Sequence, residues 1–283
     1  MVSVIIPALN AGHTLGFQLD ALAGQREAPR FEVIVADNGS TDDTREVVKA
    51  FAAKLDVSIV DASAVRGAAF ARNSAAAATR YSCLLFCDAD DRVSCSWVGA
   101  MWRALKSAPM ATGPVIRCGP SALAVEPTGP IRAPKSIERR FLNRVPYAAT
   151  SNLGVHAAIL SDLGGFDPSI SPSEDADLGV RAHIRGTEIR WEQEAVVYRQ
   201  ERETLREVAK QAFAWGMSDV DVYAKYRQLP TLRRTGWDML RPYLAIPTRA
   251  YLLATPRRRW WIASAAHRAG RLAGSIRRSV FCP

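Results

Sequence analysis

The sequence has few cysteines, no long apolar run and no glycine-rich phosphate loop, and each shortage disfavours a class of protein. Its five cysteines are odd in number and lack C-x-x-C spacing, which indicates neither a disulfide framework nor a zinc site. No apolar run reaches the roughly 18 residues that span a bilayer, and the first residues lack a basic and apolar leader. The loop after the first expected strand reads Pro7-Ala8-Leu9-Asn10, which disfavours a G-x-G-x-x-G dinucleotide oxidoreductase.

The length and charge of the chain limit its organisation. With 283 residues, 48% of them hydrophobic, it can form one large α/β domain with appendages or two small domains. The formal net charge is +9, and most of the excess lies toward the C-terminal end. That asymmetry indicates an anionic partner for this end.

Short apolar runs alternate with helical patterns over the first two thirds of the chain. We expect strands at 2–6, 31–36, 57–60, 82–87, 112–116, 150–155 and 195–198. Helices are expected at 14–22, 67–78, 94–105, 157–163 and 172–184. A further helix is expected to follow a turn at 37–42, with Ser40 or Thr41 as its N-cap. A long loop over the site is expected at 119–146. This alternation predicts an α/β fold with a mostly parallel central sheet and helices on both faces.

Three carboxylates follow one of the apolar runs directly, in Cys87-Asp88-Ala89-Asp90-Asp91. Ligands bind at the carboxyl ends of strands in open α/β sheets. Paired aspartates there suit Mg²⁺ or Mn²⁺, which prefer oxygen ligands and share substrate phosphates. A turn or a helix cap is the alternative interpretation of the same residues.

A second acidic cluster, Ser173-Glu174-Asp175-Ala176-Asp177-Leu178, also has a structural interpretation. Ser171 as N-cap, Pro172 at the first helical position and Glu174 would form a capping box, and Asp177 would pair with Arg181. Asp175 is not needed for the cap. A carboxylate at a helix N-terminus stays ionised, as a general base must.

Six segments together resemble family 2 glycosyltransferases of the GT-A fold, over about residues 2–220. They are Val4-Ile5-Ile6-Pro7-Ala8-Leu9-Asn10, Asp37-Asn38-Gly39-Ser40-Thr41-Asp42-Asp43-Thr44, Arg66-Gly67 with Ala71-Arg72-Asn73, Asp88-Ala89-Asp90-Asp91, Gly164-Gly165-Phe166-Asp167 and Glu174-Asp175-Ala176-Asp177-Leu178. The resemblance implies an inverting transfer of sugar from a nucleotide-diphosphate donor.

The resemblance also implies roles for individual residues. The donor would be bound by Pro7, Ala8, Asn10, Asp37, Arg72, Asp88, Ala89 and Asp90. Asp37 would accept a hydrogen bond from the base and Arg72 would approach the diphosphate, although an exposed helix arginine is an alternative for Arg72. Asp90, with Asp88, would hold Mg²⁺ or Mn²⁺, and Asp175 would be the catalytic base.

The sequence departs from this family at one position. Relatives often carry a histidine after the last strand that completes the metal shell, and Tyr198 stands there in this chain. None of the four histidines is placed to replace it, which predicts a metal held more weakly or by fewer protein ligands.

The C-terminal tail is basic and partly apolar. From Arg241 onward it has nine arginines and no Asp or Glu, with interleaved tyrosine, tryptophan and leucine. This composition suits the surface of an anionic membrane, and the alternative is an apolar stripe packed on the catalytic domain. No nucleic-acid module accompanies the charge, so we expect no nucleic-acid partner.

We therefore expect a GT-A catalytic domain at 1–202 and a helical C-terminal extension at 203–283. The expected function is a cytoplasmic glycosyltransferase, peripheral on the inner face of the cell membrane. It would transfer a sugar to a glycan or lipid-linked acceptor in cell-surface polysaccharide or glycolipid synthesis. The alternatives are a nucleotidyltransferase, whose glycine-rich loop is missing, and a non-catalytic membrane- or glycan-associated protein on the same fold.

Overall fold

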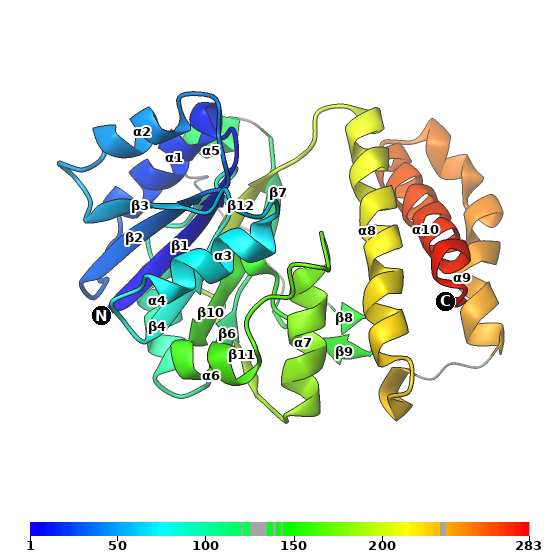
Figure 1. Cartoon of the computed structure of the whole chain (residues 1–283). Coiled ribbons are helices and arrows are strands. Elements are labelled where there is room, and N and C mark those ends of the chain that lie inside the picture. Colours follow the sequence, from blue (N-terminus) through cyan, green and yellow to red (C-terminus); the bar gives the residue numbers. More distant parts are fainter. Residues whose placement is uncertain (120, 125–134, 138–139, 143, 233–235, 283) are drawn as a thin grey trace.

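The computed structural model describes the chain except residues 120, 125–134, 138–139, 143, 233–235 and 283. An α/β body contains the strands of the central sheet, and a group of long helices from the C-terminal part stands beside it (Figure 1). α7, Glu174–Ile184, lies between the two (Figure 1).

Seven strands form the central sheet, in the order β11-β6-β10-β4-β1-β2-β3. Their bounds are Val2–Ala8 (β1), Phe31–Asp37 (β2), Val57–Asp61 (β3), Cys83–Phe86 (β4), Met110–Thr112 (β6), Leu153–His156 (β10) and Ile189–Trp191 (β11). Only β10 runs antiparallel to its neighbours within this described sheet. The predicted mostly parallel sheet is confirmed, and it brings the carboxyl ends of β1, β2 and β4 to one edge.

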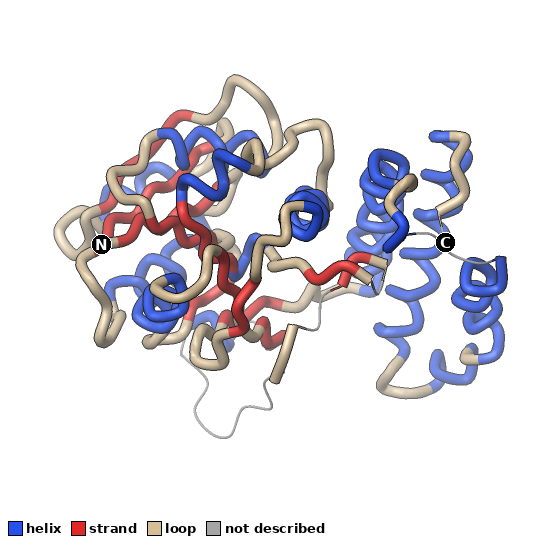
Figure 2. Tube along the Cα trace, turned by 90° about the horizontal axis from the view of Figure 1, so that it is seen from below, coloured by secondary structure: helices blue, strands red, loops and turns tan. Residues whose placement is uncertain are grey.

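Helices cover both faces of this sheet (Figure 2). One face is covered by α1 (Gly12–Ala23), α2 (Thr44–Ala50) and α4 (Trp97–Leu105), and the other by α3 (Ala68–Ala77), α6 (Ala157–Asp162) and α7. Because side chains alternate along a strand, Val4 of β1 is buried under the first set and Ile5 under the second. The sheet edge that carries the site is therefore fixed from both sides.

A second sheet of three strands lies in the order β5-β12-β7. Its strands are β5 (Asp91–Val93), β7 (Val115–Cys118) and β12 (Val197–Gln200). The single strand predicted at 112–116 is wrong, because the chain leaves β6 at Gly113 and enters β7 in the other sheet. A Cβ atom on Gly113 would overlap the carbonyl oxygen of Ala195, so this crossing needs glycine. β5 and β11, with three residues each, carried no recognisable sequence pattern.

The loop predicted at 119–146 lies partly outside the described residues. Its described part contains α5 (Ser121–Ala124) and a hairpin of β8 (Arg140–Phe141) and β9 (Val145–Pro146). Phe141 and Val145 are buried in a hydrophobic cluster with Val180 of α7 and Val220 of α8. The hairpin therefore helps to join the α/β body to the C-terminal helices.

The C-terminal part contains the long helices α8 (Leu205–Tyr226), α9 (Gly236–Thr248) and α10 (Arg258–Arg278), with short turns η2 (Pro230–Leu232) and η3 (Ala250–Ala254). α10 lies along α8 (Figure 1) and approaches it closely through glycines. A Cβ atom at Gly216 would overlap the carbonyl oxygen of His267, and one at Gly270 that of Phe213. Within the described part of the chain, no helix has the length and apolar character needed to cross a bilayer.

Candidate functional site

Three adjoining cavities lie between the carboxyl ends of the strands and the C-terminal helices. The strand-end cavity has a volume of about 620 Å³ and lies against the loop after β1, the start of α3 and the end of β4. The central cavity, about 180 Å³, shares Arg72, Asp88 and Asp90 with it. The helical cavity, about 750 Å³, shares Asp175 and Trp215 with the central cavity.

Most of the predicted donor-binding residues come together in the strand-end cavity. Its lining includes Pro7, Ala8, Asn10, Arg72, Asp88, Ala89 and Asp90. The lining also includes residues that were not predicted to bind the donor, among them Asn38, Arg66, Arg202 and Glu207. Asn38 and Arg66 belong to segments that carried the resemblance, so their signal was present, whereas Arg202 and Glu207 had none.

Asp37 is the predicted donor-binding residue that does not line this cavity. Its carboxylate is 1% exposed, accepts a hydrogen bond from the backbone N–H of Ser40 (2.9 Å) and pairs with Arg45. Burial alone would raise the pKa of Asp37, but the hydrogen bonds from Ser40 and Arg45 lower it overall. The carboxylate therefore holds the turn after β2, and its contact with a nucleobase stays a prediction.

The loop after β1 is fixed by the loop after β2. Asn10 has a φ of 51°, its side-chain oxygen accepts from the N–H of Thr41 (2.8 Å), and its own N–H donates to Ser40 Oγ (2.9 Å). Ser40 and Thr41 thus form hydrogen bonds with Asn10, and α2 begins later, at Thr44. The prediction that one of them caps α2 is therefore wrong.

The same acidic turn caps α1. Thr44 Oγ1 accepts from the N–H of Ala11 (2.9 Å) and Asp42 accepts from the N–H of Gly12 (3.0 Å). These are first-turn donors without an intrahelical partner, and the residue before α1 supplies no side-chain cap. A Cβ atom at Gly12 would overlap the Asp43 carboxylate, so the approach requires glycine. This turn thus holds Ala11, which lines the strand-end cavity, in place.

The carboxylates after β4 are surrounded by arginines. Asp88 pairs with Arg72 (2.7 Å) and Arg199 (3.4 Å), while Asp90 pairs with Arg202 (3.4 Å). Desolvation and the charge of Asp88 raise the pKa of Asp90. Burial is also the main reason that the pKa of Asp91 is raised well above its usual value. The cluster therefore favours additional positive charge beside it.

Arg72 connects this cluster to the start of α7. Its side chain is 3% exposed and pairs with Glu174 at 2.6 Å, so the alternative of an exposed helix arginine is wrong. The capping box predicted for α7 is also wrong. The helix begins at Glu174, later than Pro172, and the side chain of Ser171 is not its cap.

Asp175 and Asp177, two residues apart on α7, lie in different surroundings. Asp175 is half-buried and lines both the central and the helical cavity. Asp177 is fully buried and pairs with Arg181 (2.6 Å), as predicted, and with Lys225 of α8 (2.8 Å). Asp177 therefore fastens α7 to α8, and Asp175 is the acid of this pair that faces the cavities.

Three buried polar atoms beside the central cavity have no hydrogen-bond partner within the described part of the chain. They are Ser151 Oγ, Glu174 Oε2 and Arg72 Nε, and their residues are 1%, 5% and 3% exposed. Buried polar groups are nearly always hydrogen-bonded. Their convergence indicates a place for a polar ligand such as a sugar.

The metal prediction fits these residues only with help from a ligand. In the described residues, no group of three or more His, Cys, Asp or Glu side chains is arranged to hold a metal ion. Asp88 and Asp90 offer two carboxylates in a shared cavity, and a cation of the Mg²⁺ type commonly uses one or two carboxylates plus substrate phosphates. The donor set therefore suits a metal that arrives with a diphosphate.

Tyr198 does not stand in for the histidine of relatives. It is 1% exposed in the second sheet, whereas its neighbour Arg199 reaches Asp88 and Asp91. The alternation of side chains along β12 explains this difference. The β12 residue that pairs with the acids is therefore an arginine, which cannot ligate a metal.

Comparison with known proteins agrees with this geometry. A family model described as Glycosyl transferase family 2 matches residues 3–164, and one described as Glycosyl transferase family group 2 matches 135–270. The probable glycosyltransferase YdaM of Bacillus subtilis is 25% identical over 80% of this chain and 56% of its own length. The uncharacterized glycosyltransferase YfnE of the same organism is 41% identical over 31% of this chain, but that match is 22% of its own length. The chain thus spans about half or less of these relatives.

Solved structures show the fold. The mannosyltransferase PcManGT from Pyrobaculum calidifontis, in complex with GDP-Man and Mn2+, has a TM-score of 0.69 and 19% identity. The similarity covers 96% of this chain and 86% of that protein. The predicted GT-A fold is therefore confirmed. Because the family 2 model covers more than half of the sequence, the chain belongs to glycosyl transferase family 2.

Proposed function

We propose that the protein is an inverting glycosyltransferase. It moves a sugar from a nucleotide-diphosphate donor to a hydroxyl of a glycan or lipid-linked acceptor, in cell-surface polysaccharide or glycolipid synthesis. The observation that carries this proposal is the position of Asp175, which lines both the central cavity and the helical cavity. Asp88 and Asp90 also line the central cavity. A carboxylate between a donor cavity and an acceptor cavity has the place of a general base.

The proposed reaction is a single displacement. The acceptor hydroxyl oxygen attacks the anomeric carbon from the face opposite the diphosphate, and its proton passes to the Asp175 carboxylate. The bond from the anomeric carbon to the phosphate oxygen breaks, and its electron pair leaves with the nucleoside diphosphate. Attack opposite the leaving group inverts the anomeric configuration, and holding both substrates in adjoining cavities supplies the orientation.

The residues of the strand-end cavity would bind the donor. Pro7, Ala8 and Asn10 would border the nucleoside, while Arg72 would approach the diphosphate or the sugar. A divalent cation, Mg²⁺ or Mn²⁺, held by Asp90 and Asp88 would supply positive charge against the leaving diphosphate. Arg202, exposed and only 3.4 Å from Asp90, can release that carboxylate when a cation binds.

The sugar of the donor would occupy the central cavity. Ser151 Oγ and Glu174 Oε2 are buried beside it without partners in the described chain, and sugar hydroxyls can satisfy both. Glu174 is adjacent to Asp175 in sequence, so a sugar hydrogen-bonded to it lies beside the base. This arrangement supports transfer rather than the non-catalytic alternative, and membership of the family disfavours a nucleotidyltransferase.

The C-terminal helices would place the enzyme at a membrane. We propose residues 203–283 as an extension of the catalytic domain 1–202, peripheral on the cytoplasmic, inner face of an anionic membrane. Part of the basic charge is neutralised within the fold, because Arg271 pairs with Asp219, and Arg277 and Arg278 pair with Asp221. Both acids are on α8. On α9, exposed apolar side chains include Trp237, Leu240 and Leu244. These apolar side chains would enter the interface.

A donor screen tests the proposed function. Purified full-length protein is heated with a panel of nucleotide sugars, with Mn²⁺ and with excess chelator, and bound donors are then assayed for turnover. We expect one donor to raise the unfolding temperature of the protein, and only when metal is present. Asp90→Ala should remove this stabilisation. The control Asp162→Ala, which changes an exposed acid on α6, should keep it. Equal donor binding and turnover in chelator would contradict the metal assignment, and no turnover of any nucleotide sugar would contradict the function.

A further inference from the structure

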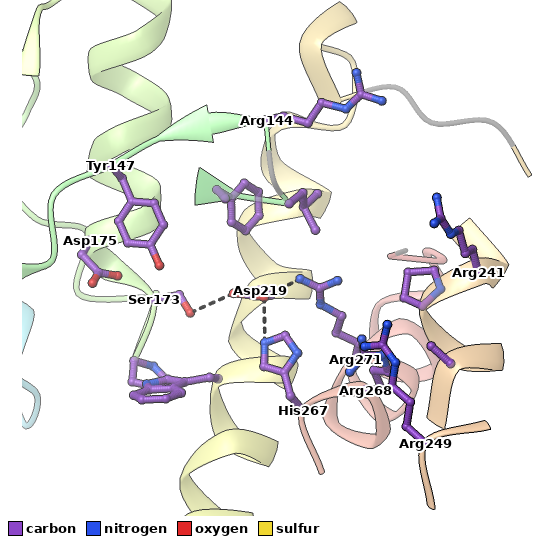
Figure 3. Close-up of a pocket in the computed structure, with 16 residues that line it drawn as sticks. Arg144, Tyr147, Ser173, Asp175, Asp219, Arg241, Arg249, His267, Arg268 and Arg271 are labelled. Atoms are coloured by element: carbon purple, nitrogen blue, oxygen red, sulfur yellow. Dashed lines mark hydrogen bonds and ion pairs between the residues drawn. The ribbon is translucent and has the colours of Figure 1, made fainter. Parts of the chain in front are cut away.

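The helical cavity is lined by an unusual number of arginines. It lies between the start of α7, the β8–β9 hairpin, α8, α9 and α10, and has a volume of about 750 Å³ (Figure 3). Five arginines line it, namely Arg144, Arg241, Arg249, Arg268 and Arg271. They come from four separate segments of the chain, so their convergence is a property of the fold.

These five arginines outnumber the two acids that line the cavity with them, Asp175 and Asp219. Asp219 of α8 pairs with Arg271 (2.8 Å) and with His267 (3.1 Å), as Figure 3 shows. Among the described side chains, no carboxylate pairs with the other four. Arg249 instead lies over the ring of Trp260, 5.7 Å from its centre.

Arg268 shows the electrostatic consequence. Burial, and after it the charges of Arg271 and Arg249, lower the pKa of its guanidinium. Its Nε atom is buried and has no hydrogen-bond partner in the described chain. Its Nη1 atom donates a hydrogen bond to the carbonyl oxygen of Ser264. Guanidinium groups brought together in a partly desolvated cavity repel each other until an anion binds between them.

Asp175 and Tyr147 lie on the side of the cavity opposite Arg241 and Arg249 (Figure 3). We propose that the helical cavity binds an acceptor that carries a phosphate or diphosphate. The arginines hold the anion, and the hydroxyl to be glycosylated lies at the Asp175 end. The proposal rests on the proposed function and names the acceptor class for the same site.

A phosphate group fits this cavity better than a carboxylate. A phosphate monoester, or a diphosphate as a whole, presents several oxygens and carries about two negative charges, and guanidinium groups bind such oxygens in bidentate pairs. A single carboxylate carries only one negative charge, so it would leave more of the positive charge of these arginines uncompensated. Both a lipid-linked diphosphate and a soluble phosphate ester have this chemistry. Arg241, which lines the cavity, follows the exposed Leu240 on α9, so an attached lipid would have apolar surface nearby.

Binding of simple phosphates tests the proposal. Full-length protein is titrated with inorganic diphosphate, farnesyl diphosphate and farnesol in the presence of chelator, so that metal-dependent binding in the strand-end cavity does not contribute. Arg241 and Arg249 are both exposed, so Arg241→Gln/Arg249→Gln should fold. We expect it to bind farnesyl diphosphate at least about tenfold more weakly than the wild type, since hydrogen bonds between charged groups are lost.

The matched control is Arg227→Gln/Arg258→Gln, which removes two exposed arginines outside the cavity and changes the net charge equally. It should bind both diphosphates like the wild type. Tighter binding of farnesyl diphosphate than of inorganic diphosphate supports a lipid-linked acceptor, and equal binding supports a soluble phosphate ester. The proposal would be overturned if both double variants lost affinity for the diphosphates equally, or if neither lost any. It would also be overturned if farnesol bound as tightly as farnesyl diphosphate.

Donor binding separates this result from the proposed function. A nucleoside diphosphate with Mn²⁺ should bind the Arg241→Gln/Arg249→Gln variant as it binds the wild type, because neither arginine lines the strand-end cavity. A parallel loss of both ligands would mean general damage to the protein and would count against the proposal. Lack of turnover of every nucleotide sugar, with phosphate binding retained, would contradict the function and leave the anion site in place.

Discussion

Replacing Arg72 with methionine should lower the free energy of unfolding by about 3 kcal/mol. Its side chain is 3% exposed and pairs at 2.6 Å with Glu174, whose side chain is 7% exposed, and at 2.7 Å with Asp88. Removing one partner of a buried pair costs about 3–5 kcal/mol, because the other charge is left without compensation. We expect the lower end, since Asp88 is 25% exposed and keeps Arg199 nearby.

Urea unfolding at pH 7 measures this loss, with Arg66→Met as the matched control. Arg66 lines the same cavity but donates only to a backbone carbonyl in the described chain, so its loss should be below about 1 kcal/mol. In the double variant Arg72→Met/Glu174→Met, the buried charge left by the first substitution is removed, and part of the stability should return. Equal losses for Arg72→Met and Arg66→Met, or a further loss in the double variant, would refute the reasoning.

Three other predictions concern the fold and the membrane. The hydrogen bond from Lys225 holds the pKa of Asp167 at about 2. Because the pair is partly exposed, Asp167→Asn should cost about 1 kcal/mol above pH 4. Acid unfolding should show this deficit vanishing as the pH falls toward 2. Gly270→Ala should destabilise by about 1–3 kcal/mol because the new Cβ overlaps a carbonyl of α8. Gly16→Ala should stabilise, because a Cβ there would make only an ordinary contact with Val47, and a shared sign of the two effects would contradict the close packing. Sedimentation with anionic vesicles should show binding that weakens with salt and with Trp237→Ser, and no binding to vesicles at low salt would remove the membrane proposal.

The sequence predicted what depends on local patterns and chain order. The alternation of apolar runs gave the parallel strands, and the acids after β4 were expected at a strand end because β4 is short, apolar and followed by Asp88. Helix starts were less predictable. Ser40 and Thr41 look like caps in sequence, yet the Ser40 hydroxyl and the Thr41 N–H bond to Asn10, 30 and 31 residues away.

Charged contacts across the fold were beyond the sequence. Arg72 lies 102 residues from Glu174, and nothing local to either residue shows that they pair in the interior. The same holds for the arginines of the helical cavity, which the sequence offered only as a basic tail. A count of charges cannot separate Arg277, neutralised by Asp221, from Arg249, which faces a cavity.

The most direct test of the central claim is the effect of Asp175→Asn on transfer and on donor binding. The amide keeps the size of the side chain but cannot accept the proton, so turnover should fall by roughly 10² to 10⁴-fold. Donor affinity should stay near that of the wild type, and Asp162→Asn, the same substitution at an exposed acid on α6, should leave both unchanged. Substantial turnover by the Asp175→Asn protein would contradict the account.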